Sequence, residues 1–103
     1  MIIYVDIDNT ICSHQNDYSL AKPWHDKIEK INNLYRQGNT IIYWSARGAT
    51  TNIDWKEFTR NQLNEWGCLY HELRVGNKPY YDILIDDKAF NTIEDYINHE
   101  NSN

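Results

Sequence analysis

Three short apolar runs constrain the fold of this chain most, because each one stops abruptly at an acidic or hydroxyl side chain. The runs cover residues 2–5, 41–44 and 83–85, and consist of aliphatic and aromatic residues. They show no alternation of apolar and polar positions, so they predict central strands that are covered on both faces, as in parallel sheets. Residues 70–75 form a weaker fourth candidate strand.

Three segments between and after these runs carry apolar residues at helical spacing. They cover residues 23–37, 53–66 and 89–99, and Gly38 follows the first of them as a stop signal. The resulting order, β-α-β-α-β-β-α, predicts an α/β fold with three layers, Rossmann-like, and a mainly parallel sheet of about four strands.

A chain of 103 residues has room for one domain, which we place at residues 1–99, with 100–103 as a polar tail. The net charge of −5 argues against a general nucleic-acid binder. No apolar run approaches the length of a membrane span. Two cysteines are too few for a disulfide scaffold, and we interpret Cys12 as a small buried residue. These features together predict a cytoplasmic domain.

Acidic residues follow two of the predicted strands as tight pairs. Asp6 and Asp8 come after the first run, and Asp86 and Asp87 after the last, while Ser45 ends the second. Ligand sites in open α/β sheets form beyond the carboxyl ends of strands, so we expect these side chains at one edge. A single pair is well explained as a helix or turn cap. Two pairs at equivalent strand ends favour a site for Mg²⁺, which prefers carboxylate oxygens.

Four sequence motifs, taken in order, resemble the haloacid dehalogenase superfamily of phosphohydrolases. The sequence DIDNT at residues 6–10 is similar to that family's first motif, DxDxT. Ser45 matches the second motif, Lys78 the third, and Asp86 with Asp87 the acidic pair of the fourth. The resemblance spans residues 2–87 and implies a small member without a cap domain.

The resemblance also implies a catalytic role for each of four residues. Asp6 is then the nucleophile that forms an aspartyl-phosphate, and Asp8 is the acid and base. Ser45 and Lys78 then hold the transferring phosphoryl oxygens.

A metal site is implied by the same resemblance. Asp6, the backbone carbonyl of Asp8, and the acids Asp86 and Asp87 would hold Mg²⁺. One of the last two would bind the metal directly and the other through water, and the sequence leaves open which.

Substrate contacts are less sharply defined by the sequence. Thr10 and Arg47 are the candidate substrate contacts, although for Thr10 we favour a role in bracing the loop over contact with the substrate. For Arg47, contact with a phosphate and a position on the surface beside a glycine turn are equally compatible with the sequence. The long loop at residues 9–22 is the expected source of further contacts.

Two departures from the family pattern bear on the site. Asn9 stands where the family has Gly, but Asn tolerates left-handed backbone conformations, so we expect the loop to form. Residues 75–82 are too few for the helix that normally joins the third and fourth strands. The absent cap predicts an open site, which suits a large substrate or a homo-oligomer whose neighbouring subunit acts as a lid.

The predicted function is a Mg²⁺-dependent phosphomonoesterase. Similar small members are associated with capsule or surface-polysaccharide synthesis in bacteria, so a sugar phosphate is the first substrate hypothesis. A polynucleotide or a phosphoprotein also suits an open site, although the acidic charge makes nucleic acid less favoured. Two non-enzymatic alternatives are a phospho-acceptor resembling a response-regulator receiver and a binding module. Motif order argues against a receiver, because receivers place the acidic pair on the first strand and the Lys last.

Overall fold

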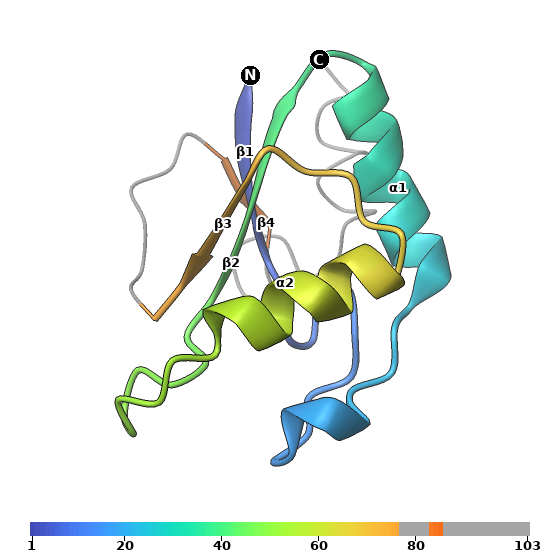
Figure 1. Ribbon diagram of the computed structural model, residues 1–103. Helices are drawn as coiled ribbons and strands as arrows, with labels where there is room; N and C mark the ends of the chain where they lie inside the picture. Colours follow the sequence, from blue (N-terminus) through green and yellow to red (C-terminus); the bar gives the residue numbers. More distant parts are fainter. Residues whose placement is uncertain (77–82, 86–103) are drawn as a thin grey trace.

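A computed structural model describes residues 1–76 and 83–85 of the chain. Its elements follow one another as β1 (Ile2–Asp6), the 3₁₀ helix η1 (Tyr18–Leu20), α1 (His25–Arg36), β2 (Thr40–Ser45), α2 (Lys56–Glu65), β3 (Glu72–Val75) and β4 (Ile83–Ile85) (Figure 1). Within these residues the predicted alternation of strands and helices is confirmed. The 3₁₀ helix inside the long loop was not predicted.

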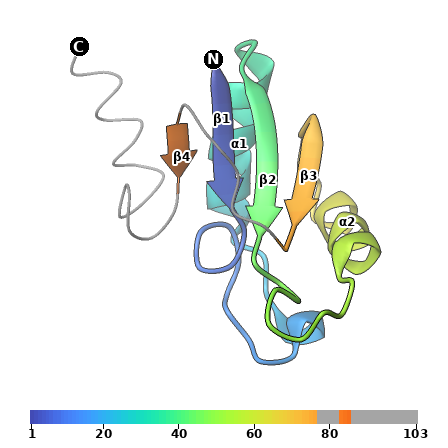
Figure 2. The same ribbon diagram turned by 90° about the vertical axis from the view of Figure 1, so that its left-hand side faces the viewer.

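The four strands form one parallel sheet in the order β3-β2-β1-β4. Figure 2 shows their arrows side by side and pointing the same way. Strand β1 lies in the interior, where Ile3 pairs with Ile41 on one side and with Ile83 on the other. The parallel sheet is therefore confirmed, including the weak strand predicted at 70–75. Because the strands are parallel, the carboxyl ends of β1 and β2 lie at the same edge.

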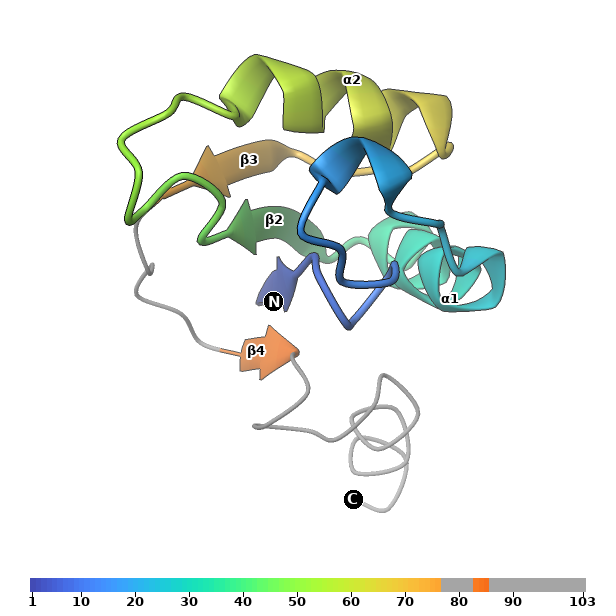
Figure 3. The ribbon, with the colours of Figure 1, turned by 90° about the horizontal axis from the view of Figure 1, so that it is seen from below.

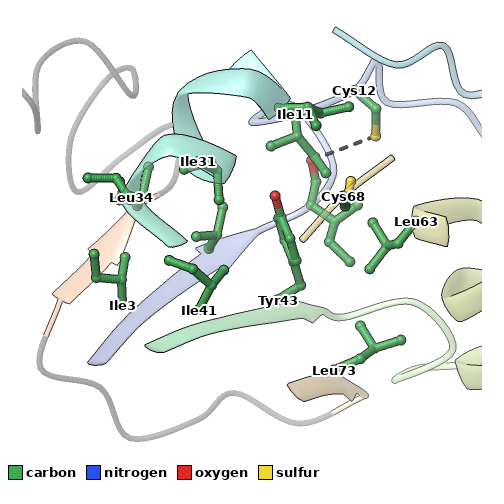
Figure 4. Packing of buried hydrophobic residues seen from close by; sticks show 14 of the residues in the cluster. Ile3, Ile11, Cys12, Ile31, Leu34, Ile41, Tyr43, Leu63, Cys68 and Leu73 are labelled. Atoms are coloured by element: carbon green, nitrogen blue, oxygen red, sulfur yellow. Dashed lines mark hydrogen bonds between the residues drawn. The ribbon is translucent and has the colours of Figure 1, made fainter. Parts of the chain in front are cut away.

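Both helices pack against the same face of the sheet (Figure 3). The core between them combines alternate strand residues with the apolar stripes of the helices: Ile3, Val5, Ile41, Tyr43 and Leu73 from the strands, and Ile28, Ile31, Leu34 and Leu63 from the helices. In Figure 4 the ring of Tyr43 reaches from β2 towards Cys68 and Ile11 at the centre of this core. Burial of these side chains stabilises the layer by roughly 1.5–3 kcal/mol each.

The opposite face carries a second, smaller cluster of Tyr4, Ile42 and Trp44. Tyr4 and Ile42 are buried, as expected for a sheet covered on both faces. The helix predicted to cover this face, at residues 89–99, lies outside the described residues. So do the connection at 77–82 and the polar tail at 100–103.

Helix α1 is slightly shorter than the predicted segment 23–37, and ends in a hydrogen-bond pattern that needs a glycine. The Asn39 N–H donates to the Leu34 carbonyl and the Gly38 N–H to the Tyr35 carbonyl. Gly38 has φ = 96°, a left-handed conformation that glycine adopts without steric cost. Helix α2 is likewise shorter than the predicted 53–66. Trp55 is the residue before its first turn, and the Asp54 side chain accepts from the Lys56 N–H there.

A buried amide ties α1 to the turn that leads from α2 into β3. Asn32 is only 4% exposed. Its Nδ2 donates to the Gly67 carbonyl at 3.0 Å, and its Oδ1 accepts from the Leu69 N–H at 2.9 Å. One side chain thus satisfies two backbone groups that would otherwise lack partners on this side of the sheet.

Replacing Asn32 with Ala should therefore lower the free energy of unfolding by about 2–3 kcal/mol, because two buried backbone groups lose their partner. Asn33→Ala is the matched control, since Asn33 is exposed on the same helix. It should change stability by less than about 0.5 kcal/mol. Urea denaturation of both variants measures the difference. Equal stability of the two would show that the Asn32 hydrogen bonds contribute nothing.

No helix in the described part of the chain is long and apolar enough to cross a bilayer. No further domain is inserted within residues 1–76, which agrees with the predicted absence of a cap.

Candidate functional site

A pocket of about 320 Å³ opens at the carboxyl ends of β1 and β2. Its walls come from the end of each strand and from the long loop that follows β1: Asp6, Asp8, Asn9, His14, Tyr18, Trp44, Ala46 and Arg47. This is the sheet edge at which the sequence predicts a site. The volume lies at the lower end of the range found for small-molecule sites.

The turn after β1 presents both acids to this pocket. Ile7 is fully buried between them and its N–H donates to the Trp44 carbonyl at 3.1 Å, which holds the turn to β2. Its own carbonyl accepts from the Ile11 N–H at 3.0 Å. Asn9 has φ = 65°, the left-handed conformation that the sequence analysis expected Asn to tolerate, and this expectation is confirmed.

Asp8 forms a two-pronged ion pair with Arg47. Nη2 of Arg47 donates to Oδ1 of Asp8 at 2.8 Å, and Nε donates to Oδ2 at 3.1 Å. The Asp8 side chain is 16% exposed and the Arg47 side chain is not exposed at all. Paired, charge-assisted hydrogen bonds of this kind fix the plane of the carboxylate as well as its position.

Arg47 is held on its other sides by α2 and the long loop. Its Nη1 donates to Gln62 Oε1 at 2.7 Å and to Thr59 Oγ1 at 3.3 Å. The guanidinium carbon lies 4.6 Å from the centre of the Tyr18 ring, which covers one face of the cation. The interpretation of Arg47 as a surface residue is therefore wrong, because burying its charge is compensated by this set of partners.

Ser45 is 1% exposed and lies beside Asp8 rather than in the pocket wall. Its hydroxyl accepts from the Arg47 N–H at 3.1 Å and lies 3.4 Å from Asp8 Oδ2, to which it donates. The structure thus brings Ser45 together with Asp8 and Arg47. Its contact with a phosphoryl oxygen stays a prediction.

Thr10 is buried at 7% exposure and is also absent from the pocket wall. Its backbone N–H donates to the Ile7 carbonyl at 3.2 Å, which agrees with a role in bracing the loop. Its Oγ1 has no hydrogen-bond partner among the described residues. Contact of Thr10 with substrate stays a prediction.

The loop at 9–22 contributes His14 and Tyr18 to the pocket, as the sequence analysis expected of this loop. Two contacts outside the loop hold Tyr18 in place. Its carbonyl accepts from Gln62 Nε2 at 2.9 Å, and its ring packs edge-on against Trp55. Asp17 begins η1 by accepting from the Ser19 side chain and backbone, and these bonds lower the pKa of Asp17.

Cys12 lies next to the acids but is unsuited to act as a nucleophile. It is fully buried, and burial, reinforced by the charge of Asp8, raises its pKa to about 12. The thiolate is the reactive form of cysteine, so this side chain stays protonated and inert near neutral pH. Its interpretation as a small buried residue is confirmed.

The donors that the described residues offer to a metal are hard oxygens, as Mg²⁺ requires. Asp6 and Asp8 both line the pocket, and the side-chain oxygens of Asp8 are engaged by Arg47. Coordination by the Asp6 carboxylate and the Asp8 backbone carbonyl stays a prediction. Within residues 1–76 and 83–85, no three His, Cys, Asp or Glu side chains gather into a metal site. Asp86 and Asp87, the further predicted ligands, lie outside the described residues, as does Lys78.

Sequence reasoning missed three residues of this site. Thr59 and Gln62, which hold Arg47, are polar side chains on the buried face of α2 next to Leu63. That position, on the apolar face of a predicted helix, is the signal that could have identified them. Trp44 lies in β2 as predicted, but it also lines the pocket, which was not predicted.

Comparison with known proteins gives one informative likeness. No family model and no curated protein matches the chain. A crystal structure of a structural-genomics target from Vibrio cholerae is similar at 29% identity, with a TM-score of 0.68. The match covers 85% of this chain and 80% of that one. The described fold is thus shared over most of its length with a solved bacterial protein.

Proposed function

We propose that this protein is a Mg²⁺-dependent phosphomonoesterase that works through an aspartyl-phosphate. The observation that carries the proposal is that two acids line the same pocket but have different surroundings. Asp6 lies at the end of β1, and Asp8, two residues on, is held by Arg47 in a fixed orientation. A nucleophile and a separate acid–base group are the two parts that such a reaction needs.

In the first step a carboxylate oxygen of Asp6 attacks phosphorus, and the bond from phosphorus to the ester oxygen breaks. The leaving oxygen takes a proton from Asp8, which must therefore be protonated before this step although it is ion-paired with Arg47 in the described structure. In the second step Asp8 removes a proton from water, which attacks the phosphorus and releases phosphate from Asp6. Ser45 and Lys78 hold the phosphoryl oxygens. Mg²⁺ held by Asp6, the Asp8 carbonyl, Asp86 and Asp87 would offset the negative charge that Asp6 and the substrate bring together.

A sugar phosphate is the proposed substrate class. The residues that line the pocket include the aromatic Tyr18 and Trp44, a residue type that suits the apolar face of a sugar, and the polar Asn9 and His14. A polynucleotide or a phosphoprotein is the alternative substrate for an open site. A neighbouring subunit that closes over the site is the alternative to a large substrate.

Release of phosphate by the purified chain tests the proposal. We expect p-nitrophenyl phosphate and hexose phosphates to be hydrolysed with Mg²⁺ present, and activity to disappear in excess EDTA and return when Mg²⁺ is restored. Absence of turnover on aryl, sugar and nucleotide phosphates with Mg²⁺ would refute the phosphatase. A phosphoryl group that stays bound to the protein, with no release of phosphate, would instead identify a phospho-acceptor.

A further inference from the structure

The ion pair between Asp8 and Arg47 leaves the carboxylate with very little freedom. Each oxygen of Asp8 accepts from a different nitrogen of the same planar guanidinium. Rotation of the carboxylate would break both hydrogen bonds together. The Ser45 hydroxyl approaches Oδ2 from a third direction. Asp8 therefore enters any reaction in an orientation that Arg47 imposes.

Arg47 is in turn unable to move without losing several contacts. Its hydrogen bonds to Asp8, Thr59 and Gln62 use four of the five N–H groups that a guanidinium carries. Tyr18 covers one face of the cation. Three separate segments, the turn after β1, the long loop and α2, thus converge on one buried side chain.

We infer that Arg47 is a positioning residue, which orients Asp8 for proton transfer to the leaving oxygen, and that Gln62 and Thr59 keep it in place. The inference rests on the proposed function. It differs from a role in binding the substrate, for which at most one N–H group of Arg47 remains. Loss of a binding residue would weaken every phosphate ester alike, whereas loss of a positioning residue affects only the proton transfers that Asp8 performs.

The leaving group separates these two roles. An alkyl phosphate, such as a hexose phosphate, expels a basic oxygen that needs a proton. p-Nitrophenyl phosphate expels a stable phenolate that hardly needs one. We expect Arg47→Lys, which keeps the charge but loses the paired geometry, to lower kcat/KM on the hexose phosphate by about 100-fold, the scale of general acid catalysis. On p-nitrophenyl phosphate the loss of kcat/KM should be under about 10-fold, because kcat/KM reports departure of the leaving group and not the later hydrolysis of the aspartyl-phosphate, which Asp8 serves for both esters.

Two further variants complete the experiment. Gln62→Leu removes one partner of Arg47 and should show the same selectivity with a smaller loss of about 10-fold, so the test stands even if Arg47→Lys fails to fold. Arg60→Lys is the control, because Arg60 is on the same helix, 42% of its side chain is exposed, and it pairs with Glu57 rather than with a residue of the site. It should leave kcat and KM unchanged.

The outcomes are distinct. Equal losses of kcat/KM on both substrates would overturn the positioning role while the phosphatase itself stands. A wild-type protein that hydrolyses neither ester with Mg²⁺ would refute the proposed function, and the inference with it.

Discussion

Replacing Asp6 with Asn is expected to abolish phosphate release, lowering kcat by at least about a thousandfold. The amide has nearly the size of the carboxylate, so β1 and its register with β2 should be kept. It cannot act as the nucleophile, and it brings no negative charge to a metal. The partly buried position of Asp6 at the end of an interior strand makes the substitution tolerable for the fold.

The measurement is steady-state release of phosphate from p-nitrophenyl phosphate, with circular dichroism and thermal unfolding as checks on folding. Asp26→Asn provides the matched control, since Asp26 is an exposed acid in the first turn of α1. That variant should keep full activity. Retention of more than about a tenth of wild-type kcat by a folded Asp6→Asn protein would eliminate Asp6 as the nucleophile.

The sequence was sufficient to predict the parallel sheet, because burial on both faces leaves a simple pattern. The runs at 2–5 and 41–44 lack polar interruptions, and each becomes a strand whose interior residues are buried. The position of Asp6 at the edge of the sheet follows from the same runs, since a strand ends where its apolar residues end. The predicted helical segments 23–37 and 53–66 each extend beyond the observed helix at both ends. Periodicity alone counted Trp24 and Trp55 as helical, whereas each is the residue just before a helix begins.

The pairing of Arg47 with Thr59 and Gln62 could not be predicted, although the helical pattern marks both partners as buried, because the pairing depends on contacts between residues that are distant in the sequence. A polar residue on a helix is usually interpreted as part of the solvent-facing side, and an arginine beside a glycine as part of a surface turn. Gln62 and Thr59 contact Arg47 because α2 packs against the sheet beside the end of β2. Arg47 can be buried because Thr59 and Gln62 accept its hydrogen bonds. These two polar side chains can lie on the buried face of α2 because Arg47 donates to them.

Gly48→Ala should be the most damaging small substitution in the described part of the chain. Gly48 follows Arg47 directly and has φ = 83°. A Cβ there would collide with the backbone carbonyl of Ile53 and lie 2.9 Å from Cδ1 of Trp55. Because the main obstacle is backbone, a change of rotamer cannot relieve it, and the loop must move. We expect a loss of about 2–4 kcal/mol in the free energy of unfolding.

The same displacement should reach the site, because the backbone of Arg47 would shift and its paired bonds to Asp8 would open. The loss of kcat/KM should then follow the selectivity for alkyl over aryl phosphates expected of Arg47→Lys. Gly38→Ala is the matched control: Gly38 also has a positive φ, 96°, but no atom lies within 4 Å of an added Cβ. That variant should lose about 1 kcal/mol and no activity. If both glycine variants unfold at the same denaturant concentration, the collision with Ile53 is relieved in solution, and the loop does not hold Arg47 in place.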